Sequence, residues 1–264
     1  MPRGAALSGS ARLPFETMTA VFVHGNPETA ALWRPLLTEL GRDDVLTVSP
    51  PGFGATVPDG FGATWDEYVS WLAAELEAIG EPVDLVGHDW GANHVMRVAC
   101  ERPDLIRSWC SDVAGAWAPD FVWHEVTQRF RTPGAGEEMM SAWLAMGASG
   151  RTIIFQPEGI APEIVKEMAE AIDAGMTQCI LRLYRSADTA AFARWRELLP
   201  AAAARPGLVL AAVGDDLAGT EAQYRWAAER AGAQVAVLNG LGHWWMLQDA
   251  ATGAAALRHF WASI

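Results

Sequence analysis

The chain has 264 residues but only three cysteines, Cys100, Cys110 and Cys179. They are scattered, odd in number and without any CxxC spacing, so they do not form the pattern of a disulfide framework. Buried thiols in a reducing compartment fit this distribution better. We therefore expect a cytoplasmic protein.

Basic side chains are also scarce. The chain carries 19 lysines and arginines against 32 aspartates and glutamates, which gives a formal net charge of −13. Nucleic acids and anionic membranes are bound through basic surfaces, so neither is expected as a partner. The excess of acid fits a solvated surface that keeps the protein in solution.

Long apolar runs are missing too. No run approaches the roughly 18–20 residues that a membrane-spanning helix needs. Residues 1–17 contain no continuous apolar stretch, so a signal peptide is not expected. Apolar residues nevertheless make up 51% of the chain. That is enough for one large core, or for a core domain with one inserted subdomain.

Short β-branched and aromatic runs alternate with segments of helical periodicity, and Thr64 is the expected cap of the second helix. This alternation predicts an α/β protein with a mostly parallel, doubly wound sheet between two helical layers. The expected strands are 19–24, 45–48, 83–86, 106–111, 208–213 and 235–238, and the expected helices are 32–40, 65–79, 91–100, 221–231 and 250–262.

The stretch 115–199 interrupts this rhythm. It is helical in pattern and rich in tryptophan, methionine and glutamate. We therefore predict a helical cap subdomain at 115–199, inserted into a core domain that is formed by 1–114 and 200–264.

The segment Gly87-His88-Asp89-Trp90-Gly91 lies between a predicted buried strand and a helix. A glycine on each side of a sharp strand-to-helix turn pushes the central side chain out above the sheet, as a nucleophile requires. Here that residue is Asp89. A carboxylate can displace a leaving group from a saturated carbon and form an alkyl ester, which activated water then hydrolyses.

A histidine and an acid are needed beside this nucleophile. His243, after Gly240-Leu241-Gly242, follows a predicted strand and can act as the general base on water. Asp215, which follows strand 208–213, is the preferred residue to orient the imidazole, since one helix and one strand separate it from His243. Asp112, at the end of the fourth strand, is the alternative acid.

The first strand ends in His24-Gly25-Asn26-Pro27. The backbone N–H groups of Asn26 and Trp90 are expected to form an oxyanion hole for ester hydrolysis. Their side chains also offer an amide N–H and an indole N–H, and an indole accepts no hydrogen bond. Aimed at one point, these donors would hold a departing halide.

These motifs, together with Pro51-Gly52-Phe53-Gly54, resemble the aspartate-nucleophile branch of the α/β-hydrolases. That branch contains haloalkane dehalogenases, fluoroacetate dehalogenases and soluble epoxide hydrolases. The resemblance covers roughly 19–112 and 205–262, and it implies the α/β-hydrolase fold with an inserted cap. It also implies no cofactor and no metal, and the sequence has no ligand cluster with zinc or calcium spacing. Only about 18 residues precede the first strand, so one or both opening strands of the family sheet are expected to be missing.

Asn26 is similar to the asparagine that joins the tryptophan in haloalkane dehalogenases, so dehalogenation of a haloalkane is the expected reaction. The segment around Tyr184 resembles a Tyr-Arg segment of epoxide hydrolases, where tyrosines protonate the ring oxygen. Tyr184 is the only tyrosine of the predicted cap, so another residue would have to replace the second one. The candidates for that replacement are Trp117, Trp123, Trp143 and His124.

Epoxide hydrolysis is therefore the alternative function. A non-catalytic protein that binds small molecules on a hydrolase scaffold is a third hypothesis, although such a protein needs no nucleophile. The expected partners are a small apolar organic substrate and water, for a monomer or a homodimer.

Overall fold

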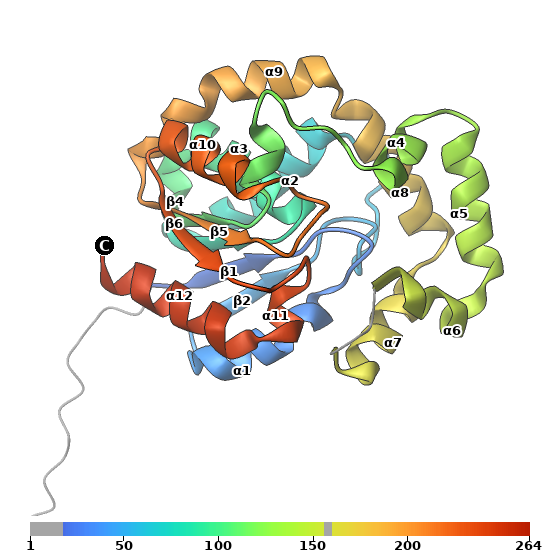
Figure 1. Cartoon of the computed structure of the whole chain (residues 1–264), viewed down its shortest axis with the longest axis horizontal. Coiled ribbons are helices and arrows are strands. Elements are labelled where there is room, and N and C mark those ends of the chain that lie inside the picture. Colours follow the sequence, from blue (N-terminus) through green and yellow to red (C-terminus); the bar gives the residue numbers. More distant parts are fainter. Residues whose placement is uncertain (1–17, 156–159) are drawn as a thin grey trace, which may run out of the picture.

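The computed structural model describes residues 18–155 and 160–264 (Figure 1). These residues form one six-stranded sheet in the order β2-β1-β3-β4-β5-β6, and every pairing in it is parallel. The α/β class and the parallel sheet are thus confirmed. The strands are β1 (Ala20–Val23), β2 (Val45–Val48), β3 (Val83–Gly87), β4 (Ile106–Ser111), β5 (Gly207–Ala212) and β6 (Gln234–Leu238).

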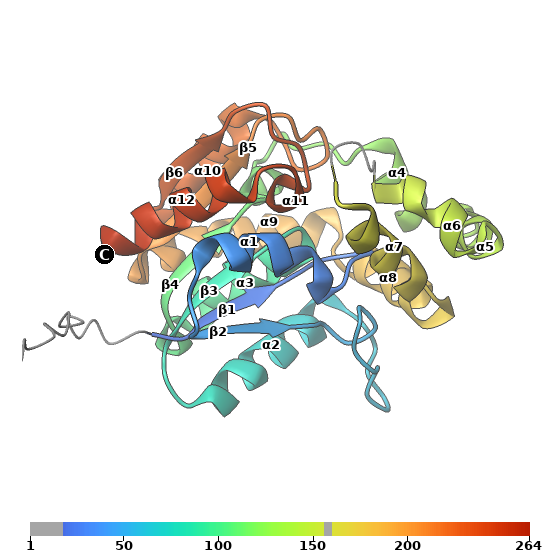
Figure 2. The ribbon, with the colours of Figure 1, turned by 90° about the horizontal axis from the view of Figure 1, so that it is seen from below.

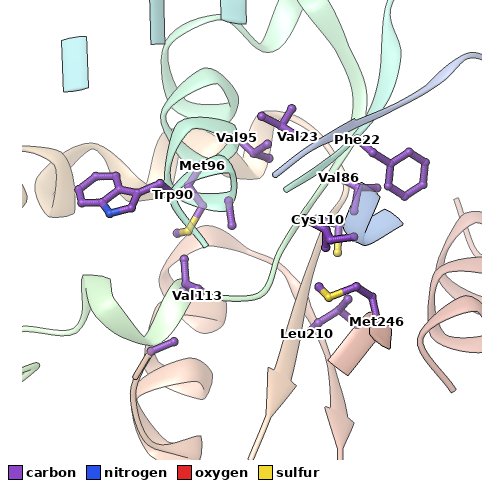
Figure 3. Packing of buried hydrophobic residues seen from close by; sticks show 14 of the residues in the cluster. Phe22, Val23, Val86, Trp90, Val95, Met96, Cys110, Val113, Leu210 and Met246 are labelled. Carbon is purple, nitrogen blue, oxygen red and sulfur yellow. The ribbon is translucent and has the colours of Figure 1, made fainter. Parts of the chain in front are cut away.

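The position of each strand follows from its side chains. β1, β3 and β5 are fully buried, as continuous apolar runs covered on both faces should be. β2 and β6 form the edges of the sheet and are largely half-exposed or exposed. Figure 3 shows Phe22, Val86, Cys110 and Leu210 from the inner strands in the shared hydrophobic core.

Helices cover both faces of the sheet (Figure 1). One layer contains α1 (Arg34–Leu40), α11 (Trp245–Gln248) and α12 (Ala250–Ala262), and α1 packs directly on α12. The other layer contains α2 (Trp65–Ile79), α3 (Trp90–Glu101) and α10 (Glu221–Ala231). Thr64 caps α2 as predicted, because its hydroxyl accepts from the Glu67 N–H while Glu67 returns a bond to the Thr64 N–H.

The residues between β4 and β5 are helical, as the pattern of the predicted cap indicates. Helices α4 to α8 lie beyond the carboxyl ends of the strands (Figures 1 and 2). α9 returns over the layer of α2 and α3, where the Trp195 ring lies 3.5 Å from the Arg97 guanidinium. The six helices are α4 (Glu125–Arg131), α5 (Ala135–Ala145), α6 (Gly147–Arg151), α7 (Pro162–Ala171), α8 (Ala174–Ser186) and α9 (Thr189–Leu198).

Short 3₁₀ turns connect several of these elements. They are η1 (Ala30–Trp33), η2 (Pro103–Leu105), η3 (Ala114–Trp117), η4 (Thr152–Phe155) and η5 (Leu199–Ala204). The helix predicted at 32–40 therefore begins as the 3₁₀ turn η1 and continues as α1.

The strand order places the site. The chain moves from β1 outward to β2, then crosses back over β1 to β3 and continues in the other direction. Ligands of such sheets bind outside the carboxyl ends of the strands where the order reverses. That point lies between β1 and β3, and Asn26 and Asp89 follow these two strands.

Two predictions concern residues 1–17, the absence of a signal peptide and the missing opening strands, and both lie outside the described residues. Among helices of the described ranges, none combines the length and the apolar character that a membrane crossing requires.

Candidate active site

The turn between β3 and α3 is strained at Asp89. This residue has φ 51° and ψ −124°, a backbone conformation that non-glycine residues rarely adopt. The neighbouring glycines are required by close packing: a side chain at Gly91 would collide with the carbonyl oxygen of Val23, and one at Gly25 would collide with the Asp89 carboxylate. The turn therefore has the geometry that the motif predicts.

The two oxygens of the Asp89 carboxylate have different surroundings. Oδ1 accepts a hydrogen bond of 3.0 Å from the backbone N–H of Asn26, while Oδ2 lies 3.8 Å from Nε2 of His243. Burial raises the pKa of Asp89 to about 6, and the nearby charge of Glu28 adds to this effect. The imidazoles of His243 and His88 and the Asn26 N–H act in the opposite direction.

The structure pairs His243 with Asp215. Nδ1 of His243 lies 2.8 Å from Oδ2 of Asp215, whose other oxygen accepts a bond of 2.7 Å from the Leu217 N–H. Burial lowers the pKa of His243, but the Asp215 charge and hydrogen bond outweigh burial, and the pKa is raised to about 9. With Asp89, these residues lie in the order that a nucleophile, a base and an orienting acid require.

The alternative acid, Asp112, makes other contacts. Its Oδ2 lies 2.6 Å from Nδ1 of His88 and accepts a bond of 2.7 Å from the indole of Trp245. The other ring nitrogen of His88 lies 2.9 Å from Glu28, which accepts a bond of 2.7 Å from the Trp244 indole. Asp112 therefore belongs to a buried cluster with His88 and Glu28 and makes no described contact with His243.

This cluster carries fixed charges beneath the nucleophile. Burial disfavours charge on each member, but the carboxylates of Asp112 and Glu28 raise the pKa of His88 well above its usual value. The same pairing lowers the pKa of Glu28 to about 2, against the opposing effect of its burial. One imidazolium between two carboxylates leaves a net negative charge, which explains why Glu28 contributes to the raised pKa of Asp89.

One group of described residues has the spacing of metal ligands: one atom each of Glu28, His88 and His243 lies within 4.8 Å of the others. Hydrogen bonds already occupy these atoms, since His88 binds Glu28 through Nε2 and His243 binds Asp215 through Nδ1. A metal ion would have to displace the proton between Glu28 and His88. The donor set thus fits a hydrogen-bonded ion cluster better than a resident metal.

A cavity of about 280 Å³ opens above Asp89 and is lined by side chains from the strand ends and from the predicted cap. It brings together the predicted site residues Asn26, Asp89, Trp90, Tyr184 and His243. The amide nitrogen of Asn26 is buried, and among the described residues it has no hydrogen-bond partner. An unpaired buried donor in a cavity wall favours a ligand that accepts a hydrogen bond.

Tyr184 on α8 contributes a hydroxyl to the same cavity. Its ring packs edge-on against Trp90, with 5.1 Å between the centroids. Burial raises the pKa of its phenol and the charge of Asp89 raises it further, while Trp90, Thr127 and Asn26 stabilise the phenolate. The phenol thus lies close to both predicted halide donors.

The candidates for the missing second tyrosine differ in position. Trp123, Trp143 and His124 line the cavity, whereas the buried indole of Trp117 donates a bond of 2.8 Å to Asn93. His124 caps α4 by accepting from the Val126 N–H, and its Nε2 lies 3.1 Å from the Thr127 hydroxyl.

Sequence reasoning missed three polar residues of the site: Glu28, Asn93 and Thr127. Only Glu28 has a recognisable signal, because it is a lone acid in the otherwise uncharged segment between Gly25 and Trp33. Asn93 and Thr127 lie on helices where a polar residue at one position is unremarkable, and only the fold turns them towards the cavity.

The sequence model of the alpha/beta hydrolase family matches residues 20–256. The chain belongs to this family. Two curated relatives are similar to this α/β hydrolase: a haloalkane dehalogenase of Bradyrhizobium diazoefficiens, 29% identical over 46% of the chain and 44% of the relative, and an epoxide hydrolase of Caballeronia sordidicola, 26% identical over 54% and 47%.

A solved structure, the haloalkane dehalogenase DbeA from Bradyrhizobium elkani, has the same fold as this α/β hydrolase. It aligns with a TM-score of 0.64 and 22% identity over 95% of the chain and 93% of the dehalogenase. The matched stretches span less than half the length of the two curated relatives. The comparisons thus support an α/β-fold hydrolase and leave the choice between the two activities to the site.

Proposed function

We propose that this protein is a hydrolase that works through a covalent alkyl ester on Asp89, and that its reaction is the conversion of an alkyl halide and water to an alcohol and halide. The observation that carries the halide assignment is the buried, unpaired amide of Asn26 in the cavity wall beside the nucleophile. Together with the Trp90 indole, it offers N–H donors where a leaving halide would develop its charge.

In the first step, Oδ2 of Asp89 attacks the carbon that bears the halogen. The carbon–oxygen bond forms as the carbon–halogen bond breaks, and the electron pair leaves with the halide. Oδ1 already accepts from the Asn26 N–H at 3.0 Å, so it is the oxygen that becomes the ester carbonyl. The reaction needs Asp89 ionised, since a protonated carboxyl is a poor nucleophile.

In the second step, water attacks the carboxyl carbon of the ester while His243 takes its proton. The Nε2 atom lies 3.8 Å from Oδ2 of Asp89. The Asn26 N–H stabilises the negative charge that forms on the carbonyl oxygen, and the Trp90 N–H can assist because it begins α3 and has no partner within the helix. The ester then collapses to the alcohol and the Asp89 carboxylate, and the proton is released to solvent.

Tyr184 favours epoxide hydrolysis as the second candidate. An epoxide oxygen leaves as a strongly basic alkoxide and must receive a proton, which a phenol can donate. Tyr184 lies in the cavity beside Trp90. Thr127, which can receive a hydrogen bond from His124 at 3.1 Å, is the nearest hydroxyl to support it.

Three substitutions distinguish the two reactions, measured as bromide release from 1-bromobutane and diol formation from styrene oxide. For a dehalogenase, Asn26→Ala and Trp90→Phe should each slow bromide release by roughly 10²–10³-fold, the usual cost of one such donor. Tyr184→Phe should then change the rate by less than about tenfold. Severe loss with Tyr184→Phe, together with diol formation and no bromide from the wild type, would replace the dehalogenase proposal with the alternative.

A further inference from the structure

Asn93 is a buried polar residue of the cavity that neither proposed reaction uses. It lies on α3 one helical turn after the nucleophile, where its backbone N–H donates to the carbonyl of Asp89 at 3.2 Å. Its side chain is only 4% exposed, yet it lines the cavity. Four residues of helix separate the two Cα atoms by about 6 Å along the axis.

The orientation of its amide is fixed by chemistry. The indole N–H of Trp117 lies 2.8 Å from Oδ1 of Asn93. An indole can only donate, so the amide atom that faces Trp117 must be the oxygen. Trp117 is itself fully buried and held between the rings of Trp65 and Phe192. The amide therefore cannot turn over without losing this bond.

The NH₂ group of Asn93 is left as a donor at the cavity. Within residues 18–155 and 160–264 it donates to no side chain or carbonyl. The nearby polar residues His124 and Thr127 are bonded to each other. Most of the remaining lining is apolar, including Val113, Ala116, Trp123, Val126, Phe130 and Met139. A lone buried donor in an apolar wall costs free energy until an acceptor meets it.

We propose that Asn93 determines specificity by donating a hydrogen bond to an acceptor oxygen in the body of the substrate. This inference rests on the proposed function, which places the reacting carbon at Asp89. The substrate class is then a short alkyl chain that carries its leaving group at one end and an ether or carbonyl oxygen a few bonds away. The spacing of about 6 Å between Asp89 and Asn93 corresponds to roughly four bonds.

The test compares two bromides of equal length, 1-bromo-4-methoxybutane and 1-bromohexane. The measured quantity is the ratio of their kcat/KM values, because the ratio cancels changes that affect both substrates. Asn93→Leu removes the donor at similar volume, and Asn93→Ala serves the same purpose if the leucine variant does not fold. The ratio should fall about tenfold or more in favour of bromohexane, since the site can no longer pair the ether oxygen.

A second measurement does not depend on turnover. In the Asp89→Asn background, quenching of tryptophan fluorescence gives the dissociation constants of the same two bromides, with and without Asn93→Leu. The ratio of constants should shift in the same direction. An unchanged ratio in both measurements would overturn the role of Asn93. If the wild type turns over neither bromide but the binding ratio still shifts, the proposed reaction fails while the role of Asn93 in binding stands.

Discussion

At the scale of single residues, the charges of Asp89 and His243 depend on one another. The imidazole lowers the pKa of Asp89 and the carboxylate raises that of His243. In the free enzyme they form an ion pair with Asp215 behind it. Formation of the ester would neutralise Asp89, which removes one of the charges that hold the proton on His243. The base would thus become competent at the step that needs it.

The first prediction concerns pH. Asp89 must be ionised to attack, and its pKa is raised to about 6. The rate constant of the first bromide burst should therefore be constant above pH 7 and fall towards tenfold per unit below about pH 6. In His243→Gln the imidazolium that lowers this pKa is gone, so the inflection should move to higher pH. A burst rate independent of pH between 5 and 8 would contradict the assignment of Asp89 as the nucleophile.

The second prediction concerns the acid. Asp215→Asn should reduce turnover by roughly 10⁴, because the imidazole loses the partner that orients it. Asp112→Asn is the matched control: it leaves the bond between His243 and Asp215 intact but breaks the buried pair with His88.

The control should mainly lower stability, by about 3–5 kcal/mol, as when one partner of a buried ion pair is removed. Urea unfolding and steady-state kinetics separate these effects. A mild Asp215→Asn together with a folded but inactive Asp112→Asn would move the orienting role to Asp112.

At the scale of elements, helix ends could be predicted where side chains define them. α2 and α10 begin after Thr64 and Thr220, each with a complete capping box, and both helices have the predicted bounds. α11 was missed because its four residues, Trp245–Gln248, are too few to show a helical period. The place of α9 was not predictable either, since the cation–π contact between Trp195 and Arg97 joins residues nearly a hundred positions apart.

The third prediction belongs to α2. Thr64→Ala removes the hydroxyl that caps the helix and should lower the free energy of unfolding by about 1 kcal/mol. Ser70→Ala on the exposed face of the same helix is the control, and its effect should stay within about 0.5 kcal/mol. Bromide release should be unchanged in both variants, since neither residue lines the cavity. Equal stability of the two variants would show that the capping bond contributes nothing measurable.

At the scale of the whole molecule, the sheet order explains why distant motifs meet. β1 and β3 are neighbours at the point where the order reverses, which brings Asn26 to within 3.0 Å of Asp89 although 63 residues separate them. The alternation of strands and helices was enough to predict this arrangement. The choice between Asp215 and Asp112 was not predictable, because both follow parallel strands and only side-chain packing decides which one reaches His243.

The buried cluster of Glu28, His88 and Asp112 escaped prediction for a related reason. Its three members come from three strand ends, and the indoles that complete it follow His243. No local spacing marks such a set. The cavity wall was equally hidden, since Asn93 and Thr127 become site residues only when the predicted cap lies over the carboxyl ends of the strands.

The most direct test of the account is the mass of His243→Gln after incubation with 1-bromobutane. This variant keeps the nucleophile and the donors but lacks the base for ester hydrolysis. Intact-protein mass spectrometry should show one butyl group per chain, and peptide mapping should locate it on Asp89, with no adduct on the matched Asp89→Asn/His243→Gln protein. Wild-type bromide release without any adduct on the variant, or an adduct at another residue, would contradict the covalent mechanism.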